Sequence, residues 1–246
     1  MKKDPYGPAS DRRTYPRRGL HGEVVHTIGA RIVRGELAPK DPVSAETEWA
    51  DGELSRTALR EAVKVLVAKG LVEMRPKTGT RVRERRFWNL LDPDVMAWRL
   101  EDTGDARLLR DVVDLRRVIE PEAARLAAQR AGDDEIADLR AAYEAMCAAG
   151  TDADAYLGPD LRFHAIILDA CHNELLGQMA TTLRRVLQVV FVIARNEAGY
   201  ARATPLHEAI LEAIADRDAD AAEAATRSLI EDTAADLERA LTRDAR

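Results

Sequence analysis

The chain has 246 residues, a formal net charge of −6, and 46% hydrophobic but only 4% aromatic residues, a composition that favours packed helices over sheets. Its two cysteines, Cys147 and Cys171, lack the spacing of a disulfide framework, which indicates a reducing compartment. No apolar run follows the basic N-terminus, and the longest one, "VLQVVFVIA", is too short to cross a bilayer, so we expect a soluble cytoplasmic protein with no membrane partner.

The charge is divided unevenly along the chain. Residues 1–86 carry 19 Lys and Arg against 12 Asp and Glu, a net charge of +7, whereas the remainder carries 18 against 31, a net charge of −13. A basic N-terminal third on an acidic body favours a nucleic-acid-binding module joined to a second domain. A chance imbalance with a basic tail is the alternative that charge alone leaves open.

The first third predicts a winged helix-turn-helix domain over residues 19–86, after a disordered tail over 1–18. A helical stripe begins after Leu20 and ends before Gly35, and a short second helix opens near Ser44. A third helix extends from Ser55 to Gly70, with an apolar face along "ALREAVKVLV". The strands "LVEM" and "TRVRE", joined by the turn "RPKTG", complete the pattern.

The polar side of the third helix indicates DNA binding. Arg56, Thr57 and Arg60 lie near its N-terminus, where side chains of a recognition helix reach base edges and phosphates. The hairpin tip offers Lys77 and Thr78 beside a glycine that lets the backbone approach a duplex. An amphipathic helix with a solvated basic face is the alternative, but the turn, the hairpin and the local charge together favour DNA.

The rest of the chain predicts helices only. Residues 87–103 are predicted as a linker helix that joins the two domains. The apolar segment "RRFWNLLDPDVMAWRLED" covers most of it, and Pro93 is the expected first residue of the helical part. An antiparallel six-helix bundle follows over 104–243, with a central cavity suited to a ligand. Its predicted helices are 105–131, 133–149, 153–171, 173–196, 202–216 and 218–243, with breaks at Gly132, Gly150, Asn173, Gly199 and Arg217. The fold class is therefore mainly α.

The segment "DLRFH" places an acid and an imidazole on the apolar side of a bundle helix. Asp160 and His164 are one helical turn apart and share a face with Ile167, Leu168 and Cys171. A metal site, a catalytic pair and a buried ion pair without chemistry all fit this pattern.

Longer motifs resemble a known family. "LSRTALREAVKVLVAKGLVEMRPKTGTRVRERRFWNLLDPDVMAW" is similar to the N-terminal module of GntR-family transcriptional regulators. "LRRVIEPEAARLAA", "DLRFH" and "LHEAILEAIADRDADAAEAA" resemble the helical FCD effector domain of its FadR subfamily. The segment "GTRV…WNLLDPDVMAW" is similar to members that sense sugar acids, such as the galactonate-operon repressors.

The resemblance implies a homodimeric repressor that binds a double-stranded DNA operator and is released from it by a small acidic effector, such as a sugar acid or another carboxylate. The implied DNA contacts are Ser55, Arg56, Thr57, Arg60, Lys77, Thr78 and Gly79. One departure lies upstream, where "KDPVSAETEWADGELSR" lacks the Pro-Ser-Glu usual in the family, so we expect a shifted or shortened second helix.

In the effector domain, the resemblance implies a divalent metal held by one Asp and three His. Asp160, His164 and His207 match three of these ligands, which suit Zn, Ni or Mn. The fourth His would fall 22 residues after His207, where this chain has Leu229. The alternatives are an effector cavity without metal and a metal-dependent enzyme acting on a small carboxylate.

The resemblance also assigns Arg116 as a cavity arginine that holds an effector carboxylate in a fork. Arg195 and Asn196 are weaker candidates for effector contacts, beside Asp160, His164 and His207. An architectural DNA-binding protein is a further alternative, although it would need no acidic bundle with a cavity.

Overall fold

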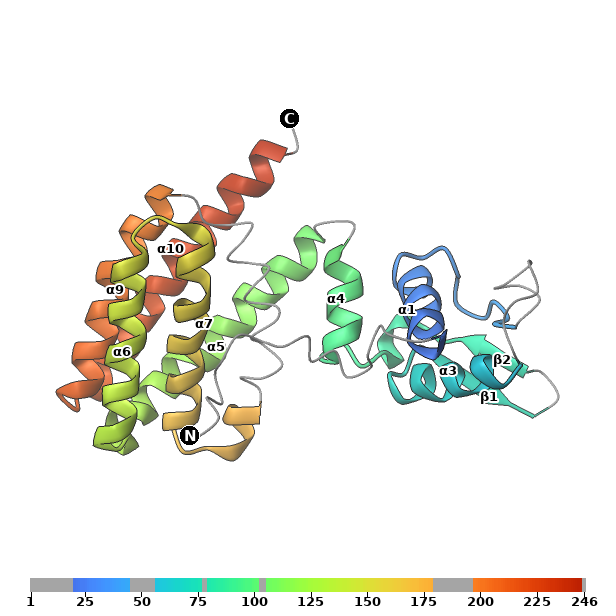
Figure 1. Ribbon diagram of the computed structural model, residues 1–246, viewed down its shortest axis with the longest axis horizontal. Helices are drawn as coiled ribbons and strands as arrows, with labels where there is room; N and C mark the ends of the chain where they lie inside the picture. Colours follow the sequence, from blue (N-terminus) through green and yellow to red (C-terminus); the bar gives the residue numbers. More distant parts are fainter. Residues whose placement is uncertain (1–19, 45–55, 77–78, 102–104, 179–196, 245–246) are drawn as a thin grey trace. The chain divides into compact units, whose positions relative to one another are not determined.

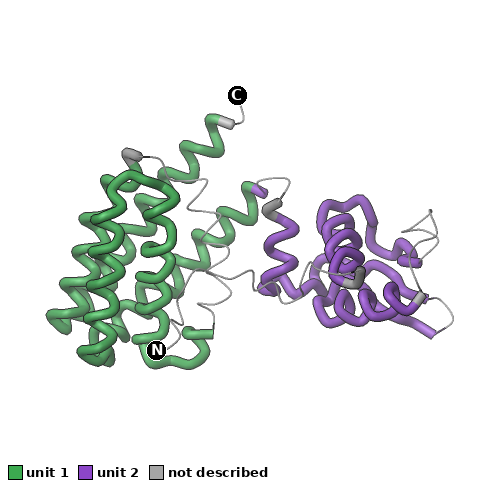
Figure 2. Tube along the Cα trace, in the orientation of Figure 1, with its two compact units in different colours: residues 1–8, 106–246 green, residues 9–105 purple. Residues whose placement is uncertain are grey.

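A computed structural model describes residues 20–44, 56–76, 79–101, 105–178 and 197–244 of the chain (Figure 1). These residues form two compact units, one within residues 9–105 and the other within residues 106–246 (Figure 2). The fold is mainly helical with one two-stranded sheet, as the sequence predicts. In the part of the chain that is described, no helix has the length and apolarity needed to span a membrane.

The first unit is a winged helix-turn-helix. Its elements are α1 (Leu20–Val33), α3 (Arg56–Ala68), β1 (Val72–Arg75), β2 (Gly79–Val82), a 3-10 turn (Arg85–Phe87) and α4 (Pro93–Glu101). Apolar residues spaced three and four apart on α1 and α3 face one another and form its core. The fully buried members of this core include Val24, Ile28, Ala62, Leu66, Leu71 and Val72. The predicted short helix near residue 48 falls outside the described residues.

Gly70 ends α3 and turns the chain into the hairpin. Its φ of +74° is left-handed, and its N–H bonds the carbonyl of Val67 while the N–H of Leu71 bonds that of Leu66. These two hydrogen bonds satisfy carbonyl groups in the last turn of the helix. A Cβ at Gly70 would lie 2.3 Å from the carbonyl oxygen of Phe87, so only glycine fits here.

The hairpin pairs β1 and β2 antiparallel, with Val72 opposite Val82 and Arg75 opposite Gly79. Residues 40–43 extend the sheet on the far side of β2, where the Val43 N–H bonds the carbonyl of Thr80. Because Val72 and Val82 are both buried, the sheet is anchored to the core of this unit.

Helix α4 packs onto α1 and belongs to the same compact unit. Asp92 caps it by accepting bonds from the N–H groups of Asp94 and Val95, and Pro93 occupies the first helical position as predicted. Trp98 lies in the core of this unit, where its indole N–H donates to Nδ1 of His26 at 2.7 Å. The segment predicted as a linker is thus packed firmly against the winged helix.

The second unit is a helical bundle made of α5 (Ala106–Arg130), α6 (Asp133–Ala149), α7 (Ala153–Ala170), α9 (Glu197–Ala215) and α10 (Ala219–Asp244). Residues 174–178 are also helical, and the remainder of the predicted helix 173–196 lies almost wholly outside the described residues. The predicted breaks at Gly132 and Gly150 are the caps of α6. Cys147 is exposed and Cys171 is buried, and they form no disulfide.

The predicted break at Gly199 is wrong. Helix α9 begins at Glu197 and continues through Gly199 and Pro205 to Ala215. Glycine weakens a helix by only about 1 kcal/mol relative to alanine, and burial of Tyr200 and Ala203 in the bundle core outweighs that cost.

Helices α5 and α10 run antiparallel along each other and are joined by a ladder of ion pairs. Arg110 pairs with Glu238 at 2.6 Å and Arg117 with Glu231 at 2.8 Å, and Arg125 contacts Asp220 further along. Four alanines of α5 are fully buried, and their small side chains allow neighbouring helices to approach closely: Ala123, Ala124, Ala127 and Ala128. Helix α7 packs against α5 and α6, and α9 packs against α10, α6 and α5.

Candidate functional site

The polar side of α3 faces solvent. Thr57 and Arg60 are exposed, whereas Ala58, Ala62 and Leu66 on the other side are buried. Arg60 lies 4.0 Å from the carboxylate of Glu61, a contact that contributes little in water. Two predicted DNA contacts therefore lie on an accessible face, while Ser55 and the side chain of Arg56 fall outside the described residues.

The wing ends in an open glycine. Gly79 has a φ of +75°, and no heavy atom lies within 4 Å of where its Cβ would be. Backbone conformation rather than crowding thus requires glycine, and the open space leaves the chain accessible to a duplex. Lys77 and Thr78 fall outside the described residues.

Asp160, His164 and His207 meet inside the helical bundle. The first two lie one turn apart on α7, and the third comes from α9. Oδ1 of Asp160 is 2.8 Å from Nε2 of His207 and 3.6 Å from Nε2 of His164. All three side chains are almost completely buried, and their ligand atoms lie within 4.8 Å of one another.

These distances fit a metal centre. Two ligands of a tetrahedral ion, each about 2.1 Å from it, are separated by about 3.4 Å. The observed separations of 2.8 and 3.6 Å bracket that value. Among the described residues, neither carboxylate oxygen of Asp160 accepts a hydrogen bond of good geometry, although both oxygens are buried. The donor set of one carboxylate and two imidazoles therefore suits Zn, Ni or Mn.

Both imidazoles turn Nε2 toward Asp160. Nδ1 of His207 lies 2.9 Å from the carbonyl oxygen of Ala203, and Nδ1 of His164 lies 3.1 Å from Oε2 of Glu120. Each of these partners is an acceptor, so each Nδ1 carries a proton. With Nδ1 protonated, the Nε2 lone pair of each ring faces a carboxylate oxygen, and either a proton or a metal ion between the two atoms satisfies both.

The charges of the site reinforce one another. Burial raises the pKa of Asp160, but its contacts with His164 and His207 outweigh this effect and hold the pKa well below its usual range. Burial also opposes the charged form of His164, yet Glu120 and Asp160 raise the pKa of this imidazole. The site therefore keeps an ionised carboxylate in a dry interior, where it attracts a cation strongly.

Arg116 points inward, as predicted, but its fork is occupied by a carboxylate of the protein. It is fully buried, and its Nε and Nη2 lie 2.7 and 3.2 Å from the two oxygens of Glu120. Burial raises the pKa of Glu120, but the charge of Arg116 and the contact with His164 lower it to about 2. Contact between Arg116 and an effector stays a prediction, and the effector would have to share the guanidinium with Glu120.

Glu120 is the residue of this site that the sequence analysis missed. It follows Arg116 by four positions on α5, the spacing at which an arginine and a glutamate meet on one helix face. That spacing was readable from "LRRVIEPE", and it would have identified the pair.

Aromatic rings enclose the site. Phe163 stands edge-on to His207, with ring centroids 5.1 Å apart, and Tyr156 lies 6.5 Å from the same imidazole. Phe163 and Tyr156 are both fully buried, so this wall excludes water from the ligand atoms. Low solvent access strengthens electrostatic contacts within the cluster.

Leu229, at the position of the implied fourth histidine, is fully buried in α10. The described residues thus provide three metal ligands, all gathered in one group. Arg195 and Asn196 fall outside the described residues.

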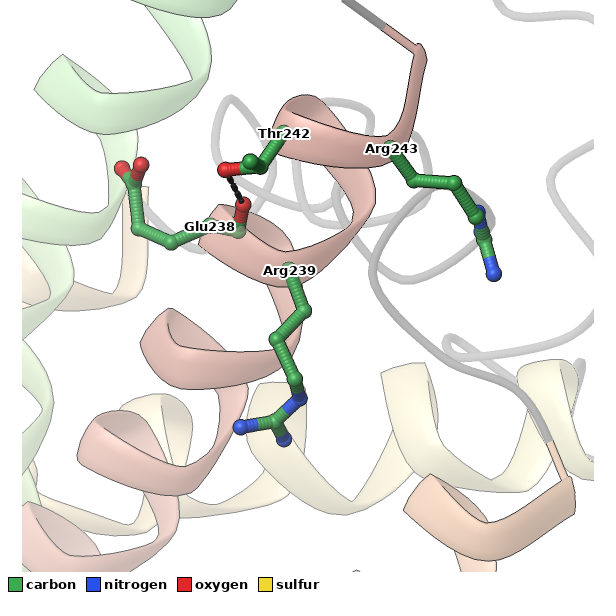
Figure 3. Close-up of a pocket in the computed structure, with 4 residues that line it drawn as sticks. All are labelled: Glu238, Arg239, Thr242 and Arg243. Carbon is green, nitrogen blue, oxygen red and sulfur yellow. Dashed lines mark hydrogen bonds between the residues drawn. The ribbon is translucent and has the colours of Figure 1, made fainter. Parts of the chain in front are cut away.

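A surface pocket of about 450 Å³ lies beside the last turns of α10 (Figure 3). Its lining residues are Glu238, Arg239, Thr242 and Arg243, and the Thr242 hydroxyl donates to the Glu238 carbonyl. The described lining residues all come from α10, and none of them belongs to the Asp160 cluster.

Comparison with known proteins identifies both units. Residues 20–82 match the family described as "Bacterial regulatory proteins, gntR family", and residues 111–232 match the FCD domain. A solved structure described as "E. coli McbR/YncC" has a TM-score of 0.52 at 18% identity, and covers 89% of this chain and 98% of its own. This likeness supports the fold.

Relatives agree along most of the chain. The galactonate operon transcriptional repressor of Escherichia coli (strain K12) is 35% identical over 210 residues, which are 84% of this chain and 92% of that protein. The HTH-type transcriptional regulator LutR of Bacillus subtilis (strain 168) is 32% identical, over 79% of this chain and 90% of LutR. These relatives are transcriptional regulators, so the enzyme alternative falls away, and the chain belongs to the GntR family as a DNA-binding transcriptional regulator with an FCD effector domain.

Proposed function

We propose that this regulator is a homodimeric repressor whose operator affinity falls when a small carboxylate binds its FCD domain. The convergence of Asp160, His164 and His207 inside the domain that matches FCD carries the proposal. The exposed polar side of α3 supports operator reading by Thr57 and Arg60. A dimer suits a palindromic operator, because each winged helix would take one half-site.

The three buried side chains would hold a divalent metal. Such an ion supplies a Lewis-acid centre, and three protein ligands leave positions open for an outside oxygen ligand. Zn, Ni and Mn all suit the donor set.

The charge balance of the site favours an anionic ligand. The charges of Arg116 and Glu120 cancel, and an imidazole that ligates a metal through its lone pair is neutral and adds no charge. Asp160 alone contributes −1, so a divalent ion leaves the centre with +1 in a buried setting. A carboxylate effector would neutralise that remaining charge, whereas a cationic ligand would add to it.

The names of relatives agree with an acidic effector. One is named for the galactonate operon and another, 31% identical, as a putative L-lactate dehydrogenase operon regulatory protein. Galactonate and lactate both carry a carboxylate and a neighbouring hydroxyl, a pair of oxygens that suits an open metal centre.

Three segments of the chain would have separate functions. Residues 19–86 would bind DNA, 87–103 would link the domains, and 104–243 would bind the effector and dimerise. Effector binding would favour an arrangement of the two winged helices that fits the operator less well, which lowers affinity through linkage.

A gel-shift titration tests this function. The full chain is expected to bind DNA from upstream of its own gene more tightly than an unrelated sequence of equal length, at moderate salt. Galactonate or lactate is expected to weaken the specific shift and leave the non-specific one unchanged. Equal affinity for both DNAs would sink the operator-binding proposal, and a shift insensitive to both acids would exclude them as effectors.

Elemental analysis of the purified chain tests the metal centre separately. One equivalent of Zn, Ni or Mn per chain is expected, and His164→Ala should remove most of it because one of three ligands is lost. His172→Ala is the matched control, since His172 is exposed and bonded to Glu135 away from the cluster. Equal metal content in the wild type and both variants would contradict the assignment of these ligands.

A further inference from the structure

Glu120 faces the imidazole of His164 from the side opposite to Asp160. Oε2 of Glu120 lies 3.1 Å from Nδ1, while Oδ1 of Asp160 lies 3.6 Å from Nε2. The two nitrogens lie on different sides of the ring, so Glu120 cannot share an ion bound at Nε2. We propose that Glu120 is a positioning residue, which holds the Nδ1 proton of His164 and so directs the Nε2 lone pair toward Asp160 and His207.

Arg116 keeps Glu120 in place. The guanidinium grips both carboxylate oxygens, with Nε at 2.7 Å from Oε1 and Nη2 at 3.2 Å from Oε2. Oε2 is also the atom that meets His164, so one oxygen joins the arginine to the imidazole. An arginine stays charged in a protein interior, and it therefore keeps the glutamate ionised and fixed in direction.

The Nδ1 atoms of the two histidines have acceptors of different strength. His207 donates its Nδ1 proton to the carbonyl of Ala203, one turn earlier on its own helix. His164 instead donates to an ionised carboxylate from α5, a stronger acceptor than a neutral carbonyl. A carboxylate behind a ligating imidazole fixes its tautomer and makes it a more basic ligand. Helix α5 thus contributes to a centre whose ligands lie on α7 and α9.

This inference rests on the proposed metal centre and can be tested apart from it. Nitrogen-15 NMR of the histidine-labelled, metal-free full chain reports which ring nitrogens of His164 carry protons. The wild type is expected to be protonated at Nδ1, whether or not Nε2 is protonated. Glu120→Gln is expected to lose this fixed state and to bind Ni²⁺ about 10- to 100-fold more weakly in calorimetric titration.

Glu122→Gln serves as the control, because Glu122 is exposed on the same helix and its change should leave both measurements unchanged. Glu120→Gln also leaves a buried arginine without its carboxylate, which can prevent folding. The double variant Arg116→Gln/Glu120→Gln removes both charges and is expected to show the same loss of nickel affinity, with its helix content checked by circular dichroism.

The possible outcomes separate the two proposals. A neutral His164 protonated only at Nε2 in the wild type would overturn the positioning role. So would nickel affinity equal to that of the wild type in folded Glu120→Gln and in the double variant. If the wild type binds none of Ni²⁺, Zn²⁺ and Mn²⁺ yet His164 carries its proton on Nδ1, the metal centre fails and the role of Glu120 in fixing the imidazole stands.

Discussion

Arg60 extends from α3 into solvent, with about three quarters of its side chain exposed. If it contacts a base edge, Arg60→Ala should weaken specific operator binding by about 1–3 kcal/mol and relax selectivity at one position. Quantitative gel shifts with the operator and with single-base variants measure both effects. Arg140→Ala removes an equal charge from the surface of α6 and should leave affinity unchanged. If the two variants bind alike, Arg60 does not read the operator.

Leu229 offers a test by adding a ligand. It is fully buried in α10, which packs along the helix that carries His207, and the family resemblance puts a histidine at this position. Leu229→His should raise the affinity for Ni²⁺ by roughly tenfold or more, which corresponds to about 1.4 kcal/mol. Without metal, the same variant should be less stable by about 1–3 kcal/mol, because a polar ring replaces an apolar side chain.

Leu237→His is the matched control for that experiment. Leu237 is as deeply buried in the same helix, two turns further on. Its replacement should cost similar stability and leave nickel affinity unchanged. Similar affinities for the two histidine variants would show that position 229 does not face the metal.

At the residue scale, the sequence could indicate which side chains form the centre but not how they point. Asp160 and His164 share a helix face by spacing alone, whereas His207 joined them only through the family resemblance. Arg116 can bind either an outside carboxylate or Glu120, and the i, i+4 spacing accounts only for the pair with Glu120. The partner of a buried arginine depends on how the helices pack, and the sequence pattern alone does not determine that packing.

At the scale of elements, α4 is locked to the winged helix at both ends. Lys69 lies between Asp92 and Asp94 at 2.9 and 2.6 Å, in a buried group that ties the start of α4 to the end of α3. Near the other end, the ring of Trp98 lies so close to α1 that a Cβ at Gly29 would be 2.4 Å from it. A motion of α4 would therefore carry the winged helix with it.

Replacement of glycine by alanine should change the free energy of unfolding in opposite directions at Gly29 and at Gly158. Gly29→Ala should destabilise the first unit by about 1–3 kcal/mol through the clash with the indole. Gly158→Ala, on α7, has open space around it and should stabilise its helix by about 0.5–1 kcal/mol. Denaturant unfolding measures both changes, and a Gly29→Ala midpoint at or above that of the wild type would contradict the close approach.

A Trp98→Leu background shows whether the indole causes the cost. There the methyl group at position 29 has room, so its penalty should shrink, and the double-mutant cycle measures the coupling. A penalty that persists undiminished would place the cause elsewhere in α1.

Helix boundaries were predictable where a glycine or a proline lies at the end of the helix. Helix α6 begins and ends at the predicted residues because Gly132 and Gly150 lie at its caps, and Pro93 starts α4 as expected. Gly199 misled the prediction because it lies inside α9, where burial of neighbouring side chains offsets its weak helix propensity. The docking of α4 onto α1 was not predictable, since it depends on the absence of a side chain at Gly29.

At the scale of the molecule, the α5–α10 ion pairs predict how acid affects the helical bundle. Bonds from Arg117 and Arg110 lower the pKa values of Glu231 and Glu238 below their ordinary value of 4.5. A carboxylate with a depressed folded-state pKa stabilises the fold above its unfolded pKa and loses that contribution as the pH falls through the folded value. These pairs should therefore stabilise the bundle at neutral pH and not in strong acid.

Arg110→Gln/Arg117→Gln measures this contribution. The variant should unfold at lower denaturant than the wild type at about pH 7, by a small amount because the pairs are largely exposed. The difference should shrink once the pH falls below the ordinary pKa of glutamate, and it should vanish below the lowered pKa values of Glu231 and Glu238 in the folded chain. Circular dichroism of the helices follows the transition, and a difference that stays constant with pH would exclude these pairs as its source.

The positions of the tryptophans and cysteines allow a distance measurement by fluorescence energy transfer. The three tryptophans of the sequence are at positions 49, 88 and 98, and the two described ones, Trp88 and Trp98, belong to the unit that carries the winged helix. The single exposed thiol, Cys147, lies in the helical unit, while Cys171 is buried. A dye coupled to Cys147 can accept energy from the indoles, so the separation between the units can be followed as metal or an organic acid is added, with every residue of the natural sequence retained.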